Sequence, residues 1–205
     1  MPESIGQDHP HTLLSKGNLA RLYCDQRKYT EAEPLYQEAL ARCQHALGQD
    51  HPDTLQSKNN LAGLYFHQGK YSEAEPLRKE ALAGRKKALG KDHPGTLLSM
   101  NNLAVLYCHQ EKYGEAETLY REVLVGRQKA LGQDHPHTLL SMNNLASLYC
   151  DQGKYSEAES LYKEALAGCQ KAPGQDHPDN LLSLNNLANL YYKQGKYSEA
   201  EHIGT

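Results

Sequence analysis

Residues 134–172 read DHPHTLLSMNNLASLYCDQGKYSEAESLYKEALAGCQKA. Nearly the same text recurs along the chain, and its opening triplet Asp-His-Pro returns every 42 residues, at Asp8, Asp50, Asp92, Asp134 and Asp176. No copy gains or loses a residue. The chain therefore divides into four full repeats, about 8–49, 50–91, 92–133 and 134–175, and a truncated fifth, 176–205. We expect a single repeat domain over residues 1–205, because such units bury an apolar core only by stacking.

Each repeat contains two segments in which apolar residues recur at helical spacing. The first segment opens at Asp-His-Pro, where proline suits the first position of a helix, and it should stop near Gly153 in the fourth repeat. The second should begin with a capping box, formed by a hydroxyl and a glutamate three residues later. The pairs are Thr30 with Glu33, Ser72 with Glu75, and Ser156 with Glu159. A glycine closes the second helix, at Gly48, Gly90 and Gly132.

Two core positions depart from the pattern. Arg78 stands where the other full repeats have Tyr36, Tyr120 and Tyr162, and Pro173 stands where they have a closing leucine. We therefore expect looser packing in the second repeat and an early end to the second helix of the fourth.

The fourth repeat resembles the tetratricopeptide repeat. The matching residues are Met142-x-x-Leu145-Ala146-x-x-Tyr149 followed by Ala158-x-x-x-Tyr162. The ordinary tetratricopeptide unit has about 34 residues, and the longer unit here is similar to those of kinesin light chains and nephrocystin. The resemblance implies an all-α fold, a right-handed α-solenoid of stacked antiparallel helix pairs known as the tetratricopeptide superhelix.

The composition argues against several classes of function. A formal net charge of −3 does not suit nucleic-acid binding, which needs a basic surface. The mean hydropathy is −0.76, and the sequence lacks the apolar run of about 20 residues that a membrane span needs. The five cysteines form no C-x-x-C motif, and an odd number argues against a disulfide framework. We therefore expect a protein of the reducing cytoplasm.

Motifs for catalysis and metal binding are missing from the sequence. Asp-His-Pro supplies one histidine to each repeat, and stacking should hold these histidines too far apart to share an ion. Phosphate-loop, nucleophile-elbow and zinc-protease motifs do not occur. We expect no enzymatic activity, no cofactor and no metal site.

The positions that vary between repeats share one face of the first helix, because residues three and four apart are neighbours on a helix. They are Arg21, Gly63, Val105, Ser147 and Asn189, then Asp25, His67, His109, Asp151 and Lys193, with Phe66 just before His67. The same face carries the pairs Asn59-Asn60, Asn101-Asn102, Asn143-Asn144 and Asn185-Asn186, with Gly17-Asn18 in the first repeat. A constant framework with variable chemistry is what a binding groove needs.

In tetratricopeptide proteins the first helices line the concave surface. The resemblance implies that the second asparagine of each pair reaches the backbone of a ligand; these are Asn18, Asn60, Asn102, Asn144 and Asn186. A carboxamide can both donate and accept, which matches a peptide unit. The alternative is a hydrogen bond to the adjacent helix. Chaperone-binding members clamp a carboxylate with lysines one turn earlier, where this chain has Leu14, Gln56, Leu98, Leu140 and Leu182. A carboxylate clamp is therefore not expected.

These observations predict a protein–protein interaction scaffold that binds an extended peptide or a partner surface in its concave groove. One alternative is a structural or oligomerising spacer that associates with itself through an open C-terminal end near Leu187 and Tyr191. Another is a sensor fragment of a larger regulatory ATPase. A spacer predicts that substitutions in the groove are silent, and a binding module predicts that they are not.

Overall fold

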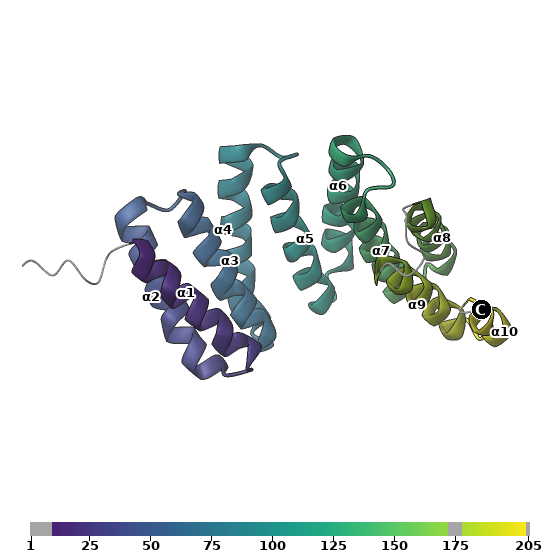
Figure 1. Ribbon diagram of the computed structural model, residues 1–205, viewed down its shortest axis with the longest axis horizontal. Helices are drawn as coiled ribbons and strands as arrows, with labels where there is room; N and C mark the ends of the chain where they lie inside the picture. The colour runs from purple at the N-terminus through teal and green to yellow at the C-terminus, as the bar shows by residue number, and fades with distance from the viewer. Residues whose placement is uncertain (1–9, 172–177, 204–205) are drawn as a thin grey trace, which may run out of the picture. The chain divides into compact units, whose positions relative to one another are not determined.

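The computed structural model describes residues 10–171 and 178–203. Every regular element within them is a helix (Figure 1). The helices are α1 Pro10–Asp25, α2 Tyr29–Leu47, α3 Pro52–His67, α4 Tyr71–Leu89, α5 Pro94–His109, α6 Tyr113–Leu131, α7 Pro136–Asp151, α8 Tyr155–Lys171, α9 Pro178–Lys193 and α10 Tyr197–Glu201. We number the pairs α1–α2 to α9–α10 as hairpins 1 to 5. The predicted all-α class and antiparallel helix pairs are confirmed.

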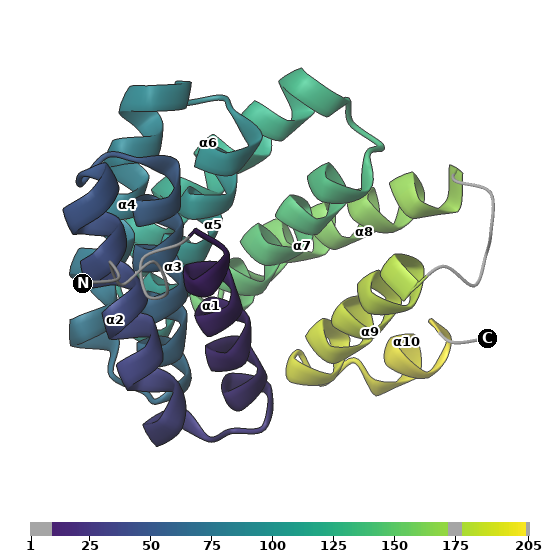
Figure 2. The ribbon, with the colours of Figure 1, turned by 60° about the vertical axis from the view of Figure 1, so that its left-hand side comes forward.

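The chain divides into two compact halves, Met1–Leu106 and Tyr107–Thr205. In the N-terminal half, α1 packs on α2, α2 on α3, and α3 on α4. In the C-terminal half, α6 packs on α7, α7 on α8, and α8 on α9, and Figure 2 shows α7 beside α8. Neighbours in sequence are thus neighbours in space within each half, as in a repeat solenoid. A single domain over residues 1–205 stays a prediction.

In the Asp-His-Pro triplets that precede α3, α5 and α7, the histidine accepts a hydrogen bond from the start of the helix, which the sequence pattern did not predict. Nδ1 of His51 and of His135 each accepts the backbone N–H of the second residue after it, at 3.2 Å. The aspartate has a different partner: Asp134 accepts from Nζ of Lys171, in the second helix of the same hairpin, at 3.0 Å. The histidine therefore caps one helix, and the aspartate ties that cap to the end of the other helix.

The second helices start without the predicted capping box. Each of α2, α4 and α6 begins at a tyrosine, and the lysine before it makes no side-chain cap hydrogen bond. Thr30 and Ser156 instead donate to the glutamate that directly follows them, at 2.7 and 3.1 Å. Glu33 and Glu159 bond side chains of the next hairpin, 35 and 32 residues away. The capping-box prediction is wrong because these glutamates serve a non-local contact.

The turn inside each hairpin contains a residue in the left-handed region. Gly69, Gly153 and Gly195 adopt φ of 73° to 75° there. Hairpins 1 and 3 have Arg27 and Glu111 at the equivalent position, with φ of 59° and 60°. This conformation costs a residue with a Cβ atom about 1 kcal/mol. The turns of hairpins 1 and 3 are therefore strained, whereas the turns with glycine are not.

Glycine also allows the two helices of a hairpin to approach closely. A Cβ atom on Gly84 would lie 2.5 Å from Cδ2 of Leu55, and one on Gly168 would lie 2.5 Å from Cδ2 of Leu139. Both leucines are buried, so neither can move aside into solvent. The first and second helices of hairpins 2 and 4 therefore pack at a distance that a side chain at these positions would increase.

Consecutive hairpins are joined by leucines of the first helix. Leu61 and Leu64 of α3 lie in one buried cluster with Ala20, Tyr36 and Leu40 of hairpin 1. Their exposed fractions are 5% and 1%. The apolar side of hairpin 1 is thus buried by hairpin 2, which is why a single repeat of this kind is not stable alone.

Arg78 is buried as deeply as the tyrosines that occupy the same position in other repeats. Its exposed fraction is 7%, against 6% for Tyr36 and 3% for Tyr162. The guanidinium lies over the ring of Phe66, 4.8 Å from the centroid, and donates to the backbone carbonyl of Asn102. The arginine is accommodated because both its charge and its donors have partners. The early helix end predicted at Pro173 lies outside the described residues.

Candidate functional site

The variable positions form an exposed face on the first helices. We call this the variable face, and its exposed members are Arg21, Asp25, His67, His109, Ser147, Asp151, Asn189 and Lys193, with half-buried Gly63 and Val105. In α7, for example, the apolar residues Leu145 and Ala146, which directly precede Ser147, are buried. The leucine and alanine positions between the members of the variable face are the same in all repeats, whereas the members themselves vary and keep contact with solvent.

The asparagine pairs border this face with unequal exposure. The second members retain access to solvent: Asn18 is exposed, and Asn60, Asn102, Asn144 and Asn186 are half-buried. The first members differ among themselves: Asn185 is exposed, Asn59 and Asn101 are half-buried, and Asn143 is buried. Each first helix thus presents one accessible carboxamide at the second position.

Asn143 joins two neighbouring first helices. Its Nδ2 donates to Oγ of Ser183 in α9 and to the carbonyl of Leu139 in its own helix, both at 3.1 Å. Nδ2 of Asn186 donates to Oδ1 of Asn143 at 3.4 Å. The alternative to ligand binding, a hydrogen bond to the adjacent helix, therefore occurs at Asn186 among the second asparagines, and Asn143, a first asparagine, makes one too.

Exposed leucines precede the accessible asparagines by one helical turn. Leu98, Leu140 and Leu182 are 49%, 39% and 40% exposed. In α3 the equivalent residue is Gln56, which donates to Oδ1 of Asn60 at 2.8 Å. The sequence analysis used these positions only to argue against a carboxylate clamp. Each of these leucines thus adds an exposed apolar group beside the accessible asparagine of its own helix.

The charges on the variable face are partly balanced. Nζ of Lys193 lies 3.7 Å from Oδ1 of Asp151 on the neighbouring first helix. In the N-terminal half the exposed ring of His67 stacks on Tyr29, with 6.5 Å between centroids. An exposed ion pair of this kind contributes little to stability. It does offset the charge of Lys193, so a strongly acidic ligand gains less attraction there.

Phe66 is half-buried and contacts both the second helix of its own hairpin and His67 of the variable face. Its ring contacts Arg78, and Tyr71 lies with its centroid 5.6 Å away. The equivalent residue in hairpin 1 is Cys24, which hydrogen-bonds Tyr36; burial raises the pKa of Tyr36 to about 12 and raises the pKa of the Cys24 thiol. This position therefore packs one helix on the other, and a contact between Phe66 and a ligand stays a prediction.

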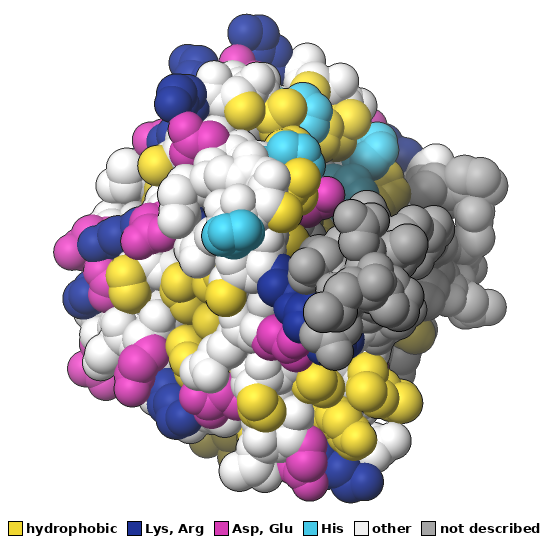
Figure 3. All heavy atoms as spheres, turned by 90° about the vertical axis from the view of Figure 1, so that its left-hand side faces the viewer, with side chains coloured by type: hydrophobic (Ala, Val, Ile, Leu, Met, Phe, Trp, Pro, Cys, Tyr) yellow, Lys and Arg dark blue, Asp and Glu magenta, His cyan; other side chains and the backbone are white. Residues whose placement is uncertain are grey.

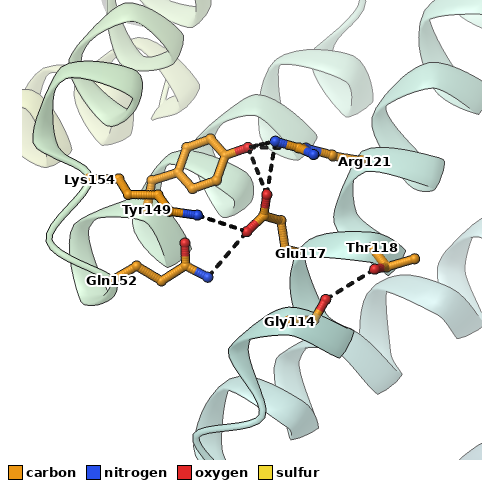
Figure 4. Close-up of polar contacts among 7 residues, drawn as sticks. All are labelled: Gly114, Glu117, Thr118, Arg121, Tyr149, Gln152 and Lys154. Carbon is orange, nitrogen blue, oxygen red and sulfur yellow. Dashed lines mark hydrogen bonds and ion pairs between the residues drawn. The ribbon is translucent and has the colours of Figure 1, made fainter.

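Glu117 links hairpin 3 to hairpin 4 (Figure 4). Its carboxylate accepts hydrogen bonds from the Tyr149 hydroxyl at 3.5 Å, Nε2 of Gln152 at 3.2 Å and Nζ of Lys154 at 3.1 Å. Arg121, one turn along α6, contacts both the carboxylate and the Tyr149 hydroxyl, each at 2.8 Å. One half-buried carboxylate thus collects three donors from the turn of the next hairpin. We call this arrangement the glutamate junction.

The glutamate junction recurs in both halves. Glu33 accepts from Gln68 and Lys70, both at 3.2 Å, and Glu159 accepts from the Tyr191 hydroxyl at 2.9 Å. The hydrogen bond from Gln68 is the main reason that the pKa of Glu33 is lowered. The capping-box prediction interpreted these glutamates as helix caps. The signal it missed is that the Tyr, Gln and Lys of each turn recur as strictly as the glutamate does.

The structure supplies limited further chemistry. Within the described part of the chain, no three His, Cys, Asp or Glu side chains come together in a way that could hold a metal ion. None of the helices described is both long and apolar enough to cross a membrane. All five cysteines are free. Figure 3 shows acidic and basic side chains interspersed over the face that it displays.

Comparison with known proteins gives consistent results. The model of the tetratricopeptide repeat family matches residues 11–87, 53–129, 97–171 and 137–205. A crystal structure of a protein from Podosopora anserina, described as a kinesin light chain with nearly identical TPR-like repeats, is 32% identical, with a TM-score of 0.84; the match covers 95% of this chain and 92% of that one. BtubC (BKLC) from P. vanneervenii is 28% identical, with a TM-score of 0.81, over 94% of this chain and 77% of that one.

More distant structures share the fold alone. A Rap protein complexed with Competence and Sporulation Factor is 16% identical, with a TM-score of 0.72, and the match covers 92% of this chain and 50% of that chain. No curated protein matches.

Proposed function

The chain belongs to the tetratricopeptide repeat family, in its kinesin light chain-like form, and from this premise we propose that its variable face binds an extended peptide or the surface of a partner protein. Proteins built from this repeat generally act as interaction scaffolds. The observation that carries the proposal is that residues on one exposed face of the first helices vary between repeats, while the leucine and alanine positions between them do not. A face that only met solvent would not need an accessible asparagine in every repeat.

Each group on the face has a proposed role. Asn18, Asn60, Asn102, Asn144 and Asn186 bond the ligand backbone, because a carboxamide complements a peptide unit. Leu98, Leu140 and Leu182 contact its apolar side chains. Selectivity comes from Val105, His109, Ser147 and Asn189, and from the charged residues Arg21, Asp151 and Lys193, with His67 beside Tyr29. Asn59, Asn101 and Asn185 are secondary contacts, and Asn143 holds α7 to α9.

The preferred ligand is a mixed polar and apolar peptide. The exposed leucines occupy the places where a carboxylate clamp has lysines, and Lys193 is paired with Asp151. A Rap protein of the same fold, solved with Competence and Sporulation Factor, supports the use of such a fold to hold a partner. We assign the chain no reaction and no nucleic-acid ligand. Five free cysteines favour a reducing compartment, which we propose to be the cytoplasm.

The test is a selection of peptides from a random library on the immobilised chain, followed by affinity measurement. The double variant Asn144→Ala, Ser147→Arg should weaken the selected peptides at least tenfold, about 1.4 kcal/mol. Ser160→Arg, an equally exposed serine on the second helix α8, serves as the matched control and should bind as the wild type does. Equal affinities for all three proteins would contradict the proposal and favour the spacer alternative.

A further inference from the structure

Hairpin 1 exposes two leucines that later hairpins bury. Leu19 and Leu22 of α1 are 41% and 51% exposed. The equivalent leucines of hairpins 2 to 5 are at most 5% exposed. These are Leu61 and Leu64, Leu103 and Leu106, Leu145 and Leu148, and Leu187 and Leu190. Where the contact is described, as for Leu61 and Leu64, the cover comes from the preceding hairpin. Hairpin 1 therefore presents an apolar surface of the kind that elsewhere receives another hairpin.

The polar donors of the glutamate junction are also unused on hairpin 1. Tyr23, Gln26 and Lys28 are equivalent to Tyr149, Gln152 and Lys154, the donors to Glu117 (Figure 4). Gln26 and Lys28 are exposed, and within the described residues neither side chain donates a hydrogen bond. The surface around Leu19 and Leu22 thus carries both the apolar and the polar groups of the junction.

Hairpin 5 carries the complementary acceptor. Glu201 of α10 stands 42 residues after Glu159, the acceptor of the preceding junction. It is exposed, and in the described part of the chain its carboxylate has no donor. Tyr192 and Tyr197 nearby are 66% and 59% exposed. Their equivalents in hairpin 1, Cys24 and Tyr29, border the cluster that receives Leu61 and Leu64, so hairpin 5 carries the border of that apolar surface.

We propose that hairpin 1 of one copy docks on hairpin 5 of a second copy and forms one more glutamate junction. Glu201 of the first copy accepts from Tyr23, Gln26 and Lys28 of the second, and Leu19 and Leu22 of the second pack against the exposed tyrosines of the first. A second copy is the occupant because its surfaces continue an interface already established between hairpins 1 and 2 and between hairpins 3 and 4.

The contact joins two different surfaces, so each copy keeps one surface unused and the assembly grows as a linear chain. The contact is weak, because α10 is short and an exposed ion pair adds little. We therefore expect association at high concentration rather than a stable dimer. This surface is separate from the variable face, and the inference does not depend on peptide binding.

Sedimentation velocity of the full chain over a concentration series tests the proposal. The average mass should rise above the 22.9 kDa of one chain and keep rising with concentration. Lys28→Glu and Glu201→Lys should each lower the association constant about tenfold, since each replaces an attraction by a repulsion. An equimolar mixture of these two variants should associate as the wild type does, because each restores the opposite charge to the other.

Leu22→Asp should abolish association, and Leu98→Asp, at a similarly exposed leucine on the variable face, should leave it unchanged. All four positions are exposed, so the variants should fold. A mass that stays at one chain up to millimolar concentration overturns the proposal. The proposal is also overturned if both charge variants associate as strongly as the wild type, or if their equimolar mixture associates no better than either variant alone. It is overturned as well if Leu98→Asp loses as much association as Leu22→Asp does.

Discussion

Hairpins 2 and 4 have the same backbone design but fill two equivalent core positions with opposite chemistry. Hairpin 4 has Met142 and Tyr162, which are 0% and 3% exposed. Hairpin 2 has Lys58 and Arg78 there, 4% and 7% exposed. The lysine reaches Glu80 at 2.9 Å, and the arginine donates to a backbone carbonyl of α5. Two buried cations thus occupy positions where another hairpin has only apolar and phenolic groups.

The comparison shows what the fold requires of these positions. It requires volume and, for a charged group, a partner within reach; it does not require apolar chemistry. Hairpin 4 gains stability from packing, whereas hairpin 2 has to recover the cost of removing two cations from water.

Truncation of the apolar position should be the most damaging change. Met142→Ala leaves a cavity at a fully buried site and should destabilise the chain by about 3 kcal/mol. Leu140→Ala on the same helix removes an exposed side chain and should cost less than about 0.5 kcal/mol. Urea denaturation followed by circular dichroism measures both. A loss under about 1 kcal/mol for Met142→Ala would show that hairpin 4 does not depend on this packing.

The close approach of the two helices should make hairpins 2 and 4 equally intolerant of an added Cβ atom. Gly84→Ala and Gly168→Ala each place a Cβ 2.5 Å from a buried leucine, and each should cost about 1–2 kcal/mol despite the better helix propensity of alanine. Gly63→Ala meets nothing within 4 Å and should gain about 0.5–1 kcal/mol. The midpoints of urea denaturation measure the change in stability of each variant. If all three variants behave alike, helix propensity alone governs these positions.

The turns of hairpins 2 and 4 have glycine at the left-handed position, whereas those of hairpins 1 and 3 have Arg27 and Glu111. Arg27→Gly and Glu111→Gly should each stabilise the chain by about 1 kcal/mol, because glycine adopts the left-handed conformation without strain. Gly153→Ala should lose a similar amount. Thermal unfolding with calorimetry provides the measurement, and a destabilised Arg27→Gly variant would mean that the arginine side chain makes a contribution larger than the strain.

Lys58→Met converts hairpin 2 toward the chemistry of hairpin 4. Methionine occupies this position in hairpins 3 and 4, and removal of a buried cation should stabilise the chain by up to about 1 kcal/mol. Glu80→Gln should instead destabilise it, since Lys58 then lacks its counter-charge. Urea titration of the two variants compares them. A less stable Lys58→Met variant would show that the ion pair itself favours the fold.

The glutamate junctions should give a small dependence on acid pH. The pKa of Glu159 lies below its ordinary value of 4.5, first because Lys163 donates to it, and Tyr191 donates as well. A carboxyl whose pKa is lower in the folded state adds stability that is present above about pH 4.5 and is lost as the pH falls through the folded value. Glu159→Gln should therefore flatten the pH profile of stability below 4.5. Identical slopes for variant and wild type would contradict this.

The sequence predicted the features that local pattern and strict repetition determine. Proline after Asp-His begins each described first helix from α3 onward, and Gly48, Gly90 and Gly132 follow the ends of α2, α4 and α6. Both signals act through the backbone of the residue concerned, so no knowledge of neighbours is needed. The fold class follows from the same signals, because helix pairs of constant length have few ways to stack.

What the sequence did not predict depends on residues far apart in the chain. Glu33 and Glu159 matched a capping box, but their partners belong to the next hairpin. Asn143 and Asn144 are adjacent and identical, yet the first is buried and bonds Ser183 of α9, whereas the second is half-buried. The periodicity of one helix cannot say which of two neighbouring asparagines the following helix will cover. The roles of the variable face as a whole stay a prediction.

The glutamate junction has a consequence for heredity. Its acceptor and its donors recur at the same place in every repeat, so any repeat can follow any other with the residues of the junction in place. Unequal recombination between two copies of the coding segment would add or delete 42 residues and leave every junction complete. Length and recognition can thus evolve separately: one changes by whole repeats, the other by single codons on the first helices.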